Sequence, residues 1–191
     1  MQAFLAEPPC ADEAALHQRL RQLRQRVWWV ATARDLAGGA ALAEVTATYS
    51  TLAEVCLAAA LDFHHAALAA RHGEPRDEHG QPQQMIVVGM GKLGGGELNV
   101  SSDIDLIYLY PAEGDTAADD TGAGAATKPI SNHEFFVRLG RKLTAALSEA
   151  TADGYVFRVD LRLRPWGDSG PFAMGFAMLE DYLVAQGRPW E

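Results

Sequence analysis

The sequence predicts an α+β fold, in which an N-terminal helical hairpin precedes a mixed sheet with helices on one face. Apolar residues recur at three- and four-residue steps in the first part of the chain. Near residue 85 they give way to short β-branched runs, interleaved with two further helical patterns. An order of α-α followed by β-β-α-β-α is typical of a layered fold with a helical appendage. We therefore expect a helical segment and linker in residues 1–84 and a sheet-containing core in residues 85–191.

The helical hairpin occupies the first part of the chain. Its first helix should run from Asp12 to about Leu36, with arginines between the apolar positions Leu16, Leu20, Leu23, Val27 and Val30. The glycine pair that begins at Gly38 should end this helix, because glycine adopts a left-handed conformation without strain. An alanine-rich second helix is expected over residues 42–71, and the polar stretch 73–84 should be a linker.

Three strands are expected after the linker. The β-branched run 85–88 should be a short buried strand, and residues 103–110 should form a second one. In residues 155–164 apolar side chains alternate with charged ones, which predicts a third strand with one face on the core. The apolar side chains occupy the odd-numbered positions, Tyr155, Phe157, Val159, Leu161 and Leu163. The charged side chains occupy even-numbered positions, Arg158, Asp160, Arg162 and Arg164.

Two more helices and a loop complete the expected core. A helix should run from Ser131 to about residue 150, with Ser131 as N-cap and Glu134 completing a capping box. Its apolar stripe consists of Phe135, Leu139, Leu143 and Leu147. A last helix is expected over residues 176–186. The small, polar residues 111–129 should be a mobile loop, because they offer little apolar surface to bury.

Composition narrows the functional classes. A formal net charge of -9 argues against general nucleic-acid binding, which needs a basic field. The chain has no basic leader segment and no apolar run long enough to cross a bilayer, so we expect a cytoplasmic protein. The two cysteines, Cys10 and Cys56, stand in no metal-binding spacing. His64, His65 and His72 are expected on a partly exposed helix face rather than at a metal site.

Asp103 and Asp105 are candidate metal ligands. They lie two residues apart at the start of a strand, so both carboxylates should point to one face. Two anions at this distance repel each other unless a cation lies between them. A hard divalent ion such as Mg²⁺ suits carboxylates combined with substrate phosphate oxygens. The plainer alternative is an ordinary exposed strand face.

Asp160 is the natural third member of such a site. It lies among three arginines at the charged, even-numbered positions of its predicted strand. Asp160 could complete a metal site while Arg162 or Arg164 holds phosphate in a bidentate fork. The alternative is again a solvated face of a half-buried strand.

The glycine-rich stretch permits two interpretations. Gly89, Gly91 and Gly94 match the dinucleotide fingerprint, but the next strand begins too soon to leave room for its helix. The alternative is a turn at Gly94 and Gly95 followed by two aspartates on the next strand. This spacing resembles the nucleotidyltransferase superfamily typified by polymerase β. There the glycine turn lets backbone N–H groups approach phosphates, and the aspartates hold metal ions.

Two longer motifs resemble one family within that superfamily. Residues 87–107 read VVGMGKLGGGELNVSSDIDLI, and residues 158–171 read RVDLRLRPWGDSGP. Both are similar to signatures of the glutamine synthetase adenylyltransferases, and the likeness extends over nearly all the chain from about Leu16. Those bifunctional enzymes carry two nucleotidyltransferase domains. The N-terminal one removes AMP from a tyrosine of glutamine synthetase, and the C-terminal one attaches it.

The resemblance implies an activity and a set of site residues. Residues 99–105 and 166–171 resemble the removing domain, which implies phosphorolysis: inorganic phosphate attacks the AMP–tyrosine phosphodiester and ADP leaves. The catalytic and metal-binding residues would be Asp103, Asp105 and Asp160, with Mg²⁺ or Mn²⁺ as cofactor. Phosphate and adenine nucleotide would be bound by Lys92, Gly94, Gly95, Ser102, Arg162 and Arg164.

The same resemblance implies partners and leaves alternatives open. Adenylylated glutamine synthetase would be the substrate, and a PII-type signalling protein would be a regulator. The same acidic site would also serve adenylyl transfer from ATP onto glutamine synthetase. A non-catalytic module that binds glutamine synthetase is a third possibility. The chain is expected to be a fragment that lacks helical parts of the family's domain at both ends, with the core truncated at the C-terminus, and such a fragment need not be active alone.

Overall fold

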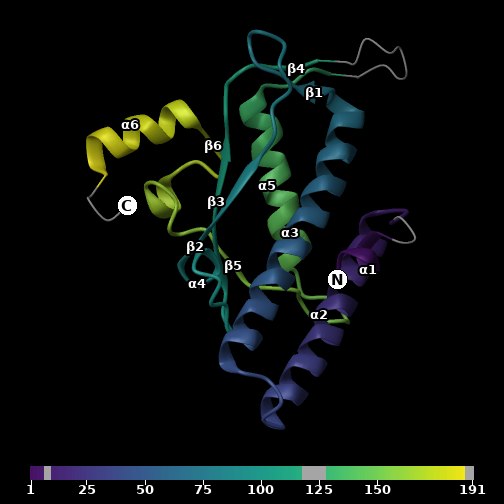
Figure 1. Ribbon diagram of the computed structural model, residues 1–191. Helices are drawn as coiled ribbons and strands as arrows, with labels where there is room; N and C mark the ends of the chain where they lie inside the picture. Colours follow the sequence, from purple (N-terminus) through teal and green to yellow (C-terminus); the bar gives the residue numbers. More distant parts are fainter. Residues whose placement is uncertain (7–9, 118–127, 188–191) are drawn as a thin grey trace. The chain divides into compact units, whose positions relative to one another are not determined.

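The structure, a computed structural model, describes residues 1–6, 10–117 and 128–187 (Figure 1). It contains two compact units. The first comprises Met1–Asp62, Gly89–Leu106 and Leu143–Asp160, and the second comprises Phe63–Val88, Ile107–Lys142 and Leu161–Glu191. Helices and a sheet are both present, as expected of an α+β fold. Each unit consists of three separate segments of the chain, and neither unit begins or ends at residue 84. The expected division into a helical segment (residues 1–84) and a sheet-containing core (residues 85–191) stays a prediction.

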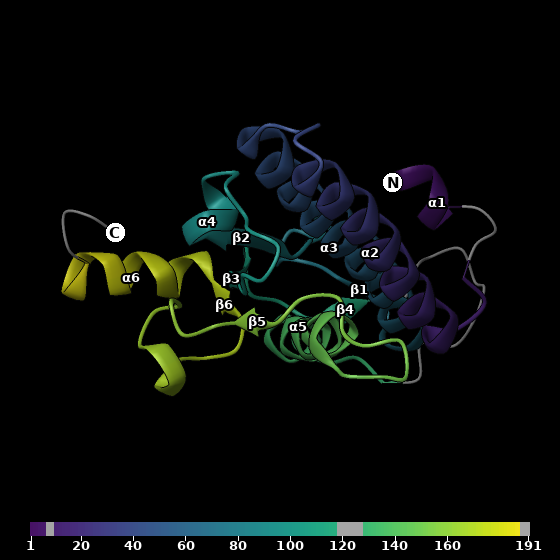
Figure 2. The same ribbon diagram turned by 90° about the horizontal axis from the view of Figure 1, so that it is seen from below.

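The predicted helical hairpin is confirmed. After the short helix α1 (Gln2–Ala6), α2 runs over Glu13–Leu36, and the Asp12 side chain caps it by accepting a hydrogen bond from the Ala15 N–H at 2.8 Å. Gly38 has a φ of 67° and ends the helix in the left-handed conformation. Helix α3 (Leu42–His72) follows, and both views show its first half alongside α2 (Figures 1 and 2).

Helix α3 contradicts the expectation that the chain has no apolar run long enough to cross a bilayer. It is long and apolar enough, by length and composition, to cross a membrane, with a mean hydropathy of 1.3 over its most apolar window. The buried core helix of a globular protein passes the same test. Three of its side chains in the first unit, Leu52, Cys56 and Ala60, are fully buried, as a core helix requires.

The sheet is built around β3 (Ile104–Tyr110). Its strand order is β2 (Ile86–Met90), β3, then β5 (Val159–Asp160), and β6 (Met174–Gly175) also pairs with β3. In the first unit β3 runs parallel to β5, with Ile104 opposite Val159 and Asp105 opposite Asp160. In the second unit its other end runs parallel to β6, with Leu109 opposite Met174. The sequence reasoning did not anticipate β6.

The predicted strand over residues 155–164 is wrong in length and in the orientation of its side chains. Only Val159 and Asp160 form a strand. Val156 is fully buried and Leu163 is 52% exposed, so the expected alternation of buried and exposed faces does not hold. The backbone departs from an extended strand both before Val159 and after Asp160. The N–H groups of Val156 and Phe157 both donate to the Leu147 carbonyl at 2.8 and 3.0 Å, and residues beyond β5 turn instead of extending.

The segments expected as linker and loop contain a small sheet of their own. In the second unit β1 (Glu74–Pro75) pairs antiparallel with β4 (Thr116–Ala117). The buried Asn132 side chain ties this region together by donating to the carbonyls of Arg76 and Ala112, each at 3.0 Å. The expectation of an unstructured loop is therefore wrong for residues 111–117. Residues 118–127, where the rest of the loop was expected, lie outside the described part of the chain.

Both predicted late helices are confirmed, as α5 (Asn132–Ser148) and α6 (Phe176–Gln186). Ser131 is the N-cap of α5, since its Oγ accepts from the Glu134 N–H at 3.2 Å. The Glu134 carboxylate, expected to complete a capping box, accepts a hydrogen bond from Arg138 one turn further along. The apolar stripe is fully buried at all its predicted positions, Phe135, Leu139, Leu143 and Leu147.

In the second unit the buried Tyr110 at the end of β3 meets two exposed polar residues, Glu113 and His133. The Tyr110 hydroxyl donates to Glu113 Oε1 at 2.6 Å and lies 3.2 Å from His133 Nδ1. Burial raises the pKa of Tyr110, and the bond to Glu113 raises it further. Gly175 of β6 packs closely here, because a Cβ on it would come within 3.0 Å of the Glu113 carboxylate. The hydrogen bonds therefore satisfy the buried hydroxyl where β3 and β6 meet.

A buried arginine connects three segments of the first unit. Arg21 on α2 has no exposed surface and donates to the carbonyls of His17, Ala146 and Gly154 at 2.9, 3.2 and 2.8 Å, and also to that of Glu149. Burial lowers the pKa of the Arg21 guanidinium, while the Glu149 carboxylate opposes this effect. The planar fork satisfies carbonyls at the end of α5 and in the turn that leads to β5.

Replacing Arg21 should therefore destabilise the protein strongly. We expect Arg21→Met to lower the free energy of unfolding by about 3 kcal/mol, because one buried and three partly buried hydrogen bonds to backbone carbonyls are lost together. Arg34→Met is the matched control, since Arg34 is half-exposed and pairs with Glu44 at the surface. The control should cost less than about 1 kcal/mol. Urea denaturation of both variants measures the difference, and equal losses would contradict the assigned role.

Candidate functional site

Asp105 and Asp160 lie directly opposite each other on neighbouring parallel strands. Their register in β3 and β5 places both side chains on the same face of the sheet, with backbones separated by about 4.8 Å. Both residues are half-buried. Two carboxylates on adjacent strands repel each other, and a cation between them would remove that repulsion. The structure thus brings together two of the three predicted metal ligands.

Asp103 lies just before β3 and is exposed. The loop that carries it is anchored to β5 by Arg158, whose carbonyl accepts from the Ile104 N–H at 2.9 Å and whose guanidinium donates to the Ser101 carbonyl at 2.7 Å. All three aspartates belong to the described residues, but they do not form a group whose carboxylate oxygens all lie within 4.8 Å of one another. Metal binding by the three together stays a prediction.

The glycine turn approaches the aspartate pair at Gly91. This residue begins the short helix α4 (Gly91–Gly94) with a φ of 54°, and a Cβ on it would lie 2.8 Å from Asp105 Oδ2. Glycine is thus required twice at this position, for the backbone conformation and for the close approach of the carboxylate. The sequence reasoning assigned Gly94 and Gly95 to the site and missed Gly91, although the glycine spacing contained the signal.

Gly94 has a structural role of its own. A Cβ on Gly94 would come within 2.6 Å of the Gly89 carbonyl oxygen, so α4 can pack against the end of β2 only with glycine here. Gly95 is the C-cap of α4, where its N–H donates to the Gly91 carbonyl at 3.1 Å. Phosphate binding by Gly94 and Gly95 stays a prediction.

Two other predicted phosphate ligands lie near each other. Lys92 Nζ is 3.5 Å from Ser102 Oγ, a long contact that joins α4 to the loop before β3. The far end of the same loop is fixed by Ser50 of α3, whose buried Oγ accepts from the Leu98 N–H at 3.1 Å. Sequence reasoning missed Ser50, because no local pattern connects it to a segment almost fifty residues away.

The two predicted phosphate-binding arginines lie in the second unit, beyond the end of β5. Arg162 is exposed, whereas the Arg164 side chain is only 10% exposed. Arg164 donates to the Leu161 carbonyl at 2.7 Å and lies 3.9 Å from the Asp168 carboxylate. The prediction that both share a strand face with Asp160 is wrong, because the chain turns after Asp160. A role in phosphate binding stays a prediction for each.

The whole chain, residues 1–191, matches the family described as glutamate-ammonia ligase adenylyltransferase. The chain belongs to this family. It is similar to bifunctional glutamine synthetase adenylyltransferase/adenylyl-removing enzymes of Nitrosomonas eutropha (55% identity over 94% of the chain) and Burkholderia mallei (56% over 97%). A third such relative, from Chromobacterium violaceum, is 54% identical over 100% of the chain. The chain spans about a fifth of the length of these relatives, 19% to 20%.

Membership of the adenylyltransferase family confirms the resemblance of the two motifs, which include the aspartates and the glycine turn. The matched region carries both motifs whole, at residues 87–107 and 158–171. The names of these relatives include both attaching and removing activities, so they do not decide between the two for this segment.

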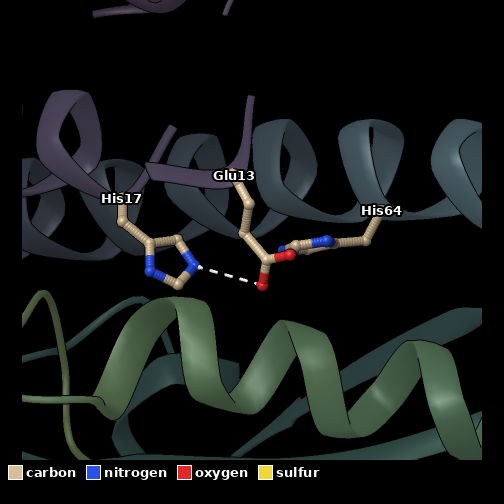
Figure 3. A group of neighbouring side chains, drawn as sticks. All are labelled: Glu13, His17 and His64. Atoms are coloured by element: carbon tan, nitrogen blue, oxygen red, sulfur yellow. Dashed lines mark ion pairs between the residues drawn. The ribbon is translucent and has the colours of Figure 1, made fainter. Parts of the chain in front are cut away.

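The histidines differ from their expected environment. His64 and His72, expected on a partly exposed face of α3, are buried. His65 Nε2 lies 3.0 Å from the Glu74 carboxylate, an ion pair if the ring is protonated. Figure 3 shows a further pair on α2, where His17 Nε2 lies 3.9 Å from Glu13 Oε1 one turn away, and it also labels His64. The prediction was wrong for His64 and His72, because α3 is enclosed more completely at these positions than its alanine-rich pattern indicated, and it holds for His65, which is partly exposed.

Adding a methyl group at Gly91 should impair the site selectively. Gly91→Ala meets the Asp105 carboxylate, so we expect affinity for Mg²⁺ or Mn²⁺ to fall at least about tenfold, as a displaced ligand loses about 1.4 kcal/mol. Gly96→Ala is the matched control, because Gly96 also has a positive φ but has nothing within 4 Å of an added Cβ. Both variants should lose about 1 kcal/mol of stability from backbone strain.

Calorimetric titration with Mn²⁺ and urea denaturation would measure the two effects separately. Equal cation affinity in Gly91→Ala and Gly96→Ala would show that the approach of Gly91 to Asp105 has no role in metal binding.

Proposed function

We propose that this chain removes AMP from adenylylated glutamine synthetase by metal-dependent phosphorolysis, releasing ADP. The observation that carries the proposal is the pairing of Asp105 with Asp160 beside the glycine turn at Gly91. Such an acidic pair suits a metal-dependent reaction between polyanions. The direction is supported by residues 99–105 and 166–171, which resemble the removing domain of the family. The proposed fold is that of a polymerase β-like nucleotidyltransferase.

The acidic residues would hold the metal. Asp103, Asp105 and Asp160 offer hard oxygen ligands, and the mutual repulsion of the opposed pair favours a cation such as Mg²⁺ or Mn²⁺. When bound, the ion supplies positive charge where two phosphate groups must approach each other. Gly91 gives the Asp105 carboxylate room on the side of α4. No side-chain nucleophile is required.

The reaction balances with phosphate as the nucleophile. A phosphate oxygen forms a bond to the phosphorus of the adenylyl group, and the bond from that phosphorus to the tyrosine oxygen breaks. The tyrosine oxygen takes up a proton, and AMP joined to phosphate leaves as ADP. Positive or polar groups for the phosphates would come from Lys92, Gly94, Gly95 and Ser102 of the first unit, which would orient the nucleophile in line. The sequence-based assignment of Arg162 and Arg164 to phosphate stays a prediction.

Two other functions remain as alternatives to the proposed one. The same acidic site would serve adenylyl transfer from ATP onto unmodified glutamine synthetase, and the names of the relatives include that activity. A non-catalytic module that binds glutamine synthetase would have no use for opposed carboxylates. We further propose a cytoplasmic location and regulation by a PII-type signalling protein, both from the family resemblance.

The decisive experiment uses a longer protein that contains this chain, incubated with adenylylated glutamine synthetase, phosphate and Mg²⁺. ADP should appear, and Asp105→Asn should reduce its rate at least about 100-fold through loss of charge at the metal site. Asp181→Asn is the control, since Asp181 is exposed on α6 and should leave the rate unchanged.

The alternatives give different products. Pyrophosphate release from ATP with unmodified glutamine synthetase, without phosphate-dependent release of AMP, would assign adenylyl transfer instead. Binding of glutamine synthetase without either reaction would assign a regulatory module.

A further inference from the structure

A hollow in the first unit lies next to the glycine turn. One wall is the first turn of α3, with Leu42, Ala43 and Thr46. The rest of the lining comes from Lys92 of α4 and from Glu97 and Asn99 in the segment after it. The hollow has a volume of about 640 Å³, within the range of pockets that hold small ligands.

The lining combines apolar surface with a few polar groups. Leu42 is 74% exposed, so a large apolar side chain faces solvent at the edge of the hollow. Covering this side chain with a flat apolar ligand would remove its surface from water and so favour binding. The amide of Asn99 and the carboxylate of Glu97 can exchange hydrogen bonds with ring nitrogens or ribose hydroxyls. This is the chemistry that a nucleoside requires.

The charges of the hollow fit a neutral group better than an anion. Lys92 contributes one positive charge and Glu97 one negative charge, and their backbones are joined by a hydrogen bond of 2.8 Å from the Glu97 N–H to the Lys92 carbonyl. Opposite charges of equal size leave no net attraction for a second phosphate. The ammonium of Lys92 instead suits the boundary between a nucleoside and its phosphate.

The short helix α4 connects the hollow to the aspartate pair. At its first residue, Gly91 approaches the Asp105 carboxylate, and the next residue, Lys92, already lines the hollow. Helix α4 has only four residues, which span about 6 Å at 1.5 Å per residue. A nucleotide whose phosphate lies at Asp105 would therefore reach the hollow with its nucleoside.

We propose that this hollow binds the adenosine part of the adenylyl group, with Leu42 covering the base and Glu97 and Asn99 bonding its polar edges. The inference rests on the proposed function, because it requires the adenylyl phosphate to lie at Asp105 and Asp160. It assigns to the start of α3 a part in nucleotide recognition, beyond its place in the helical hairpin.

The test compares binding of ADP with binding of pyrophosphate, which has two linked phosphates without the nucleoside. In Ala43→Trp an exposed alanine becomes a side chain that fills the hollow. With Mg²⁺ present, we expect its affinity for ADP to fall at least about tenfold while its affinity for pyrophosphate changes less than about twofold. The control is Ala58→Trp, at another exposed site on α3 about 22 Å further along the helix.

A second variant keeps the test independent of folding. Leu42→Ser removes exposed apolar surface and should leave the fold intact, yet weaken ADP binding about threefold to tenfold. Unchanged ADP affinity in both Ala43→Trp and Leu42→Ser, together with its loss in Asp105→Asn, would overturn the nucleoside site and leave the proposed function standing. Unchanged binding of both ligands in Asp105→Asn would contradict the proposed function itself.

Discussion

The first unit depends on holding two carboxylates opposite each other on a very short strand pair. β5 has only two residues, and one of them is Asp160, which faces Asp105 across the pairing. Strand pairing alone would be weak against the repulsion of the two charges. The chain before β5 is therefore fixed from elsewhere, by Arg21 at the preceding turn and by the Leu147 carbonyl that accepts from two successive N–H groups. These contacts hold Asp160 opposite Asp105, as the proposed metal site requires.

The glycine turn is adapted to the same pair of carboxylates. Gly91 lies against Asp105 where any Cβ would collide, and Gly94 allows α4 to fold back onto the end of β2. A turn built this closely leaves the backbone of α4 beside the acidic site and the Lys92 side chain beside the neighbouring hollow. One short segment thus connects the proposed reaction centre with the proposed nucleoside site.

Several features could be predicted from the sequence because they follow from local rules. The helices expected from apolar periodicity are present as α2, α3, α5 and α6. Asp12 and Ser131 cap α2 and α5 as expected, and Gly38 ends α2. The family could also be predicted, because its two motifs are long and lie in a fixed order. The prediction that Asp105 and Asp160 lie on one face of the sheet is right. It depended, however, on a strand over residues 155–164, of which only Val159 and Asp160 form a strand.

The sequence by itself determined the helix boundaries, the family and the residue types of the candidate site, since each depends on neighbours in the chain. Only the tertiary structure decided how late β5 begins, because the Leu147 carbonyl accepts the N–H groups of Val156 and Phe157, which a longer strand would have used. Only the fold showed that Gly91 must be glycine, as the atom it would strike belongs to Asp105, fourteen positions away. Contacts between residues far apart in the chain produce no periodic pattern in the sequence. The candidate site around Asp105 and Asp160 depends on such contacts.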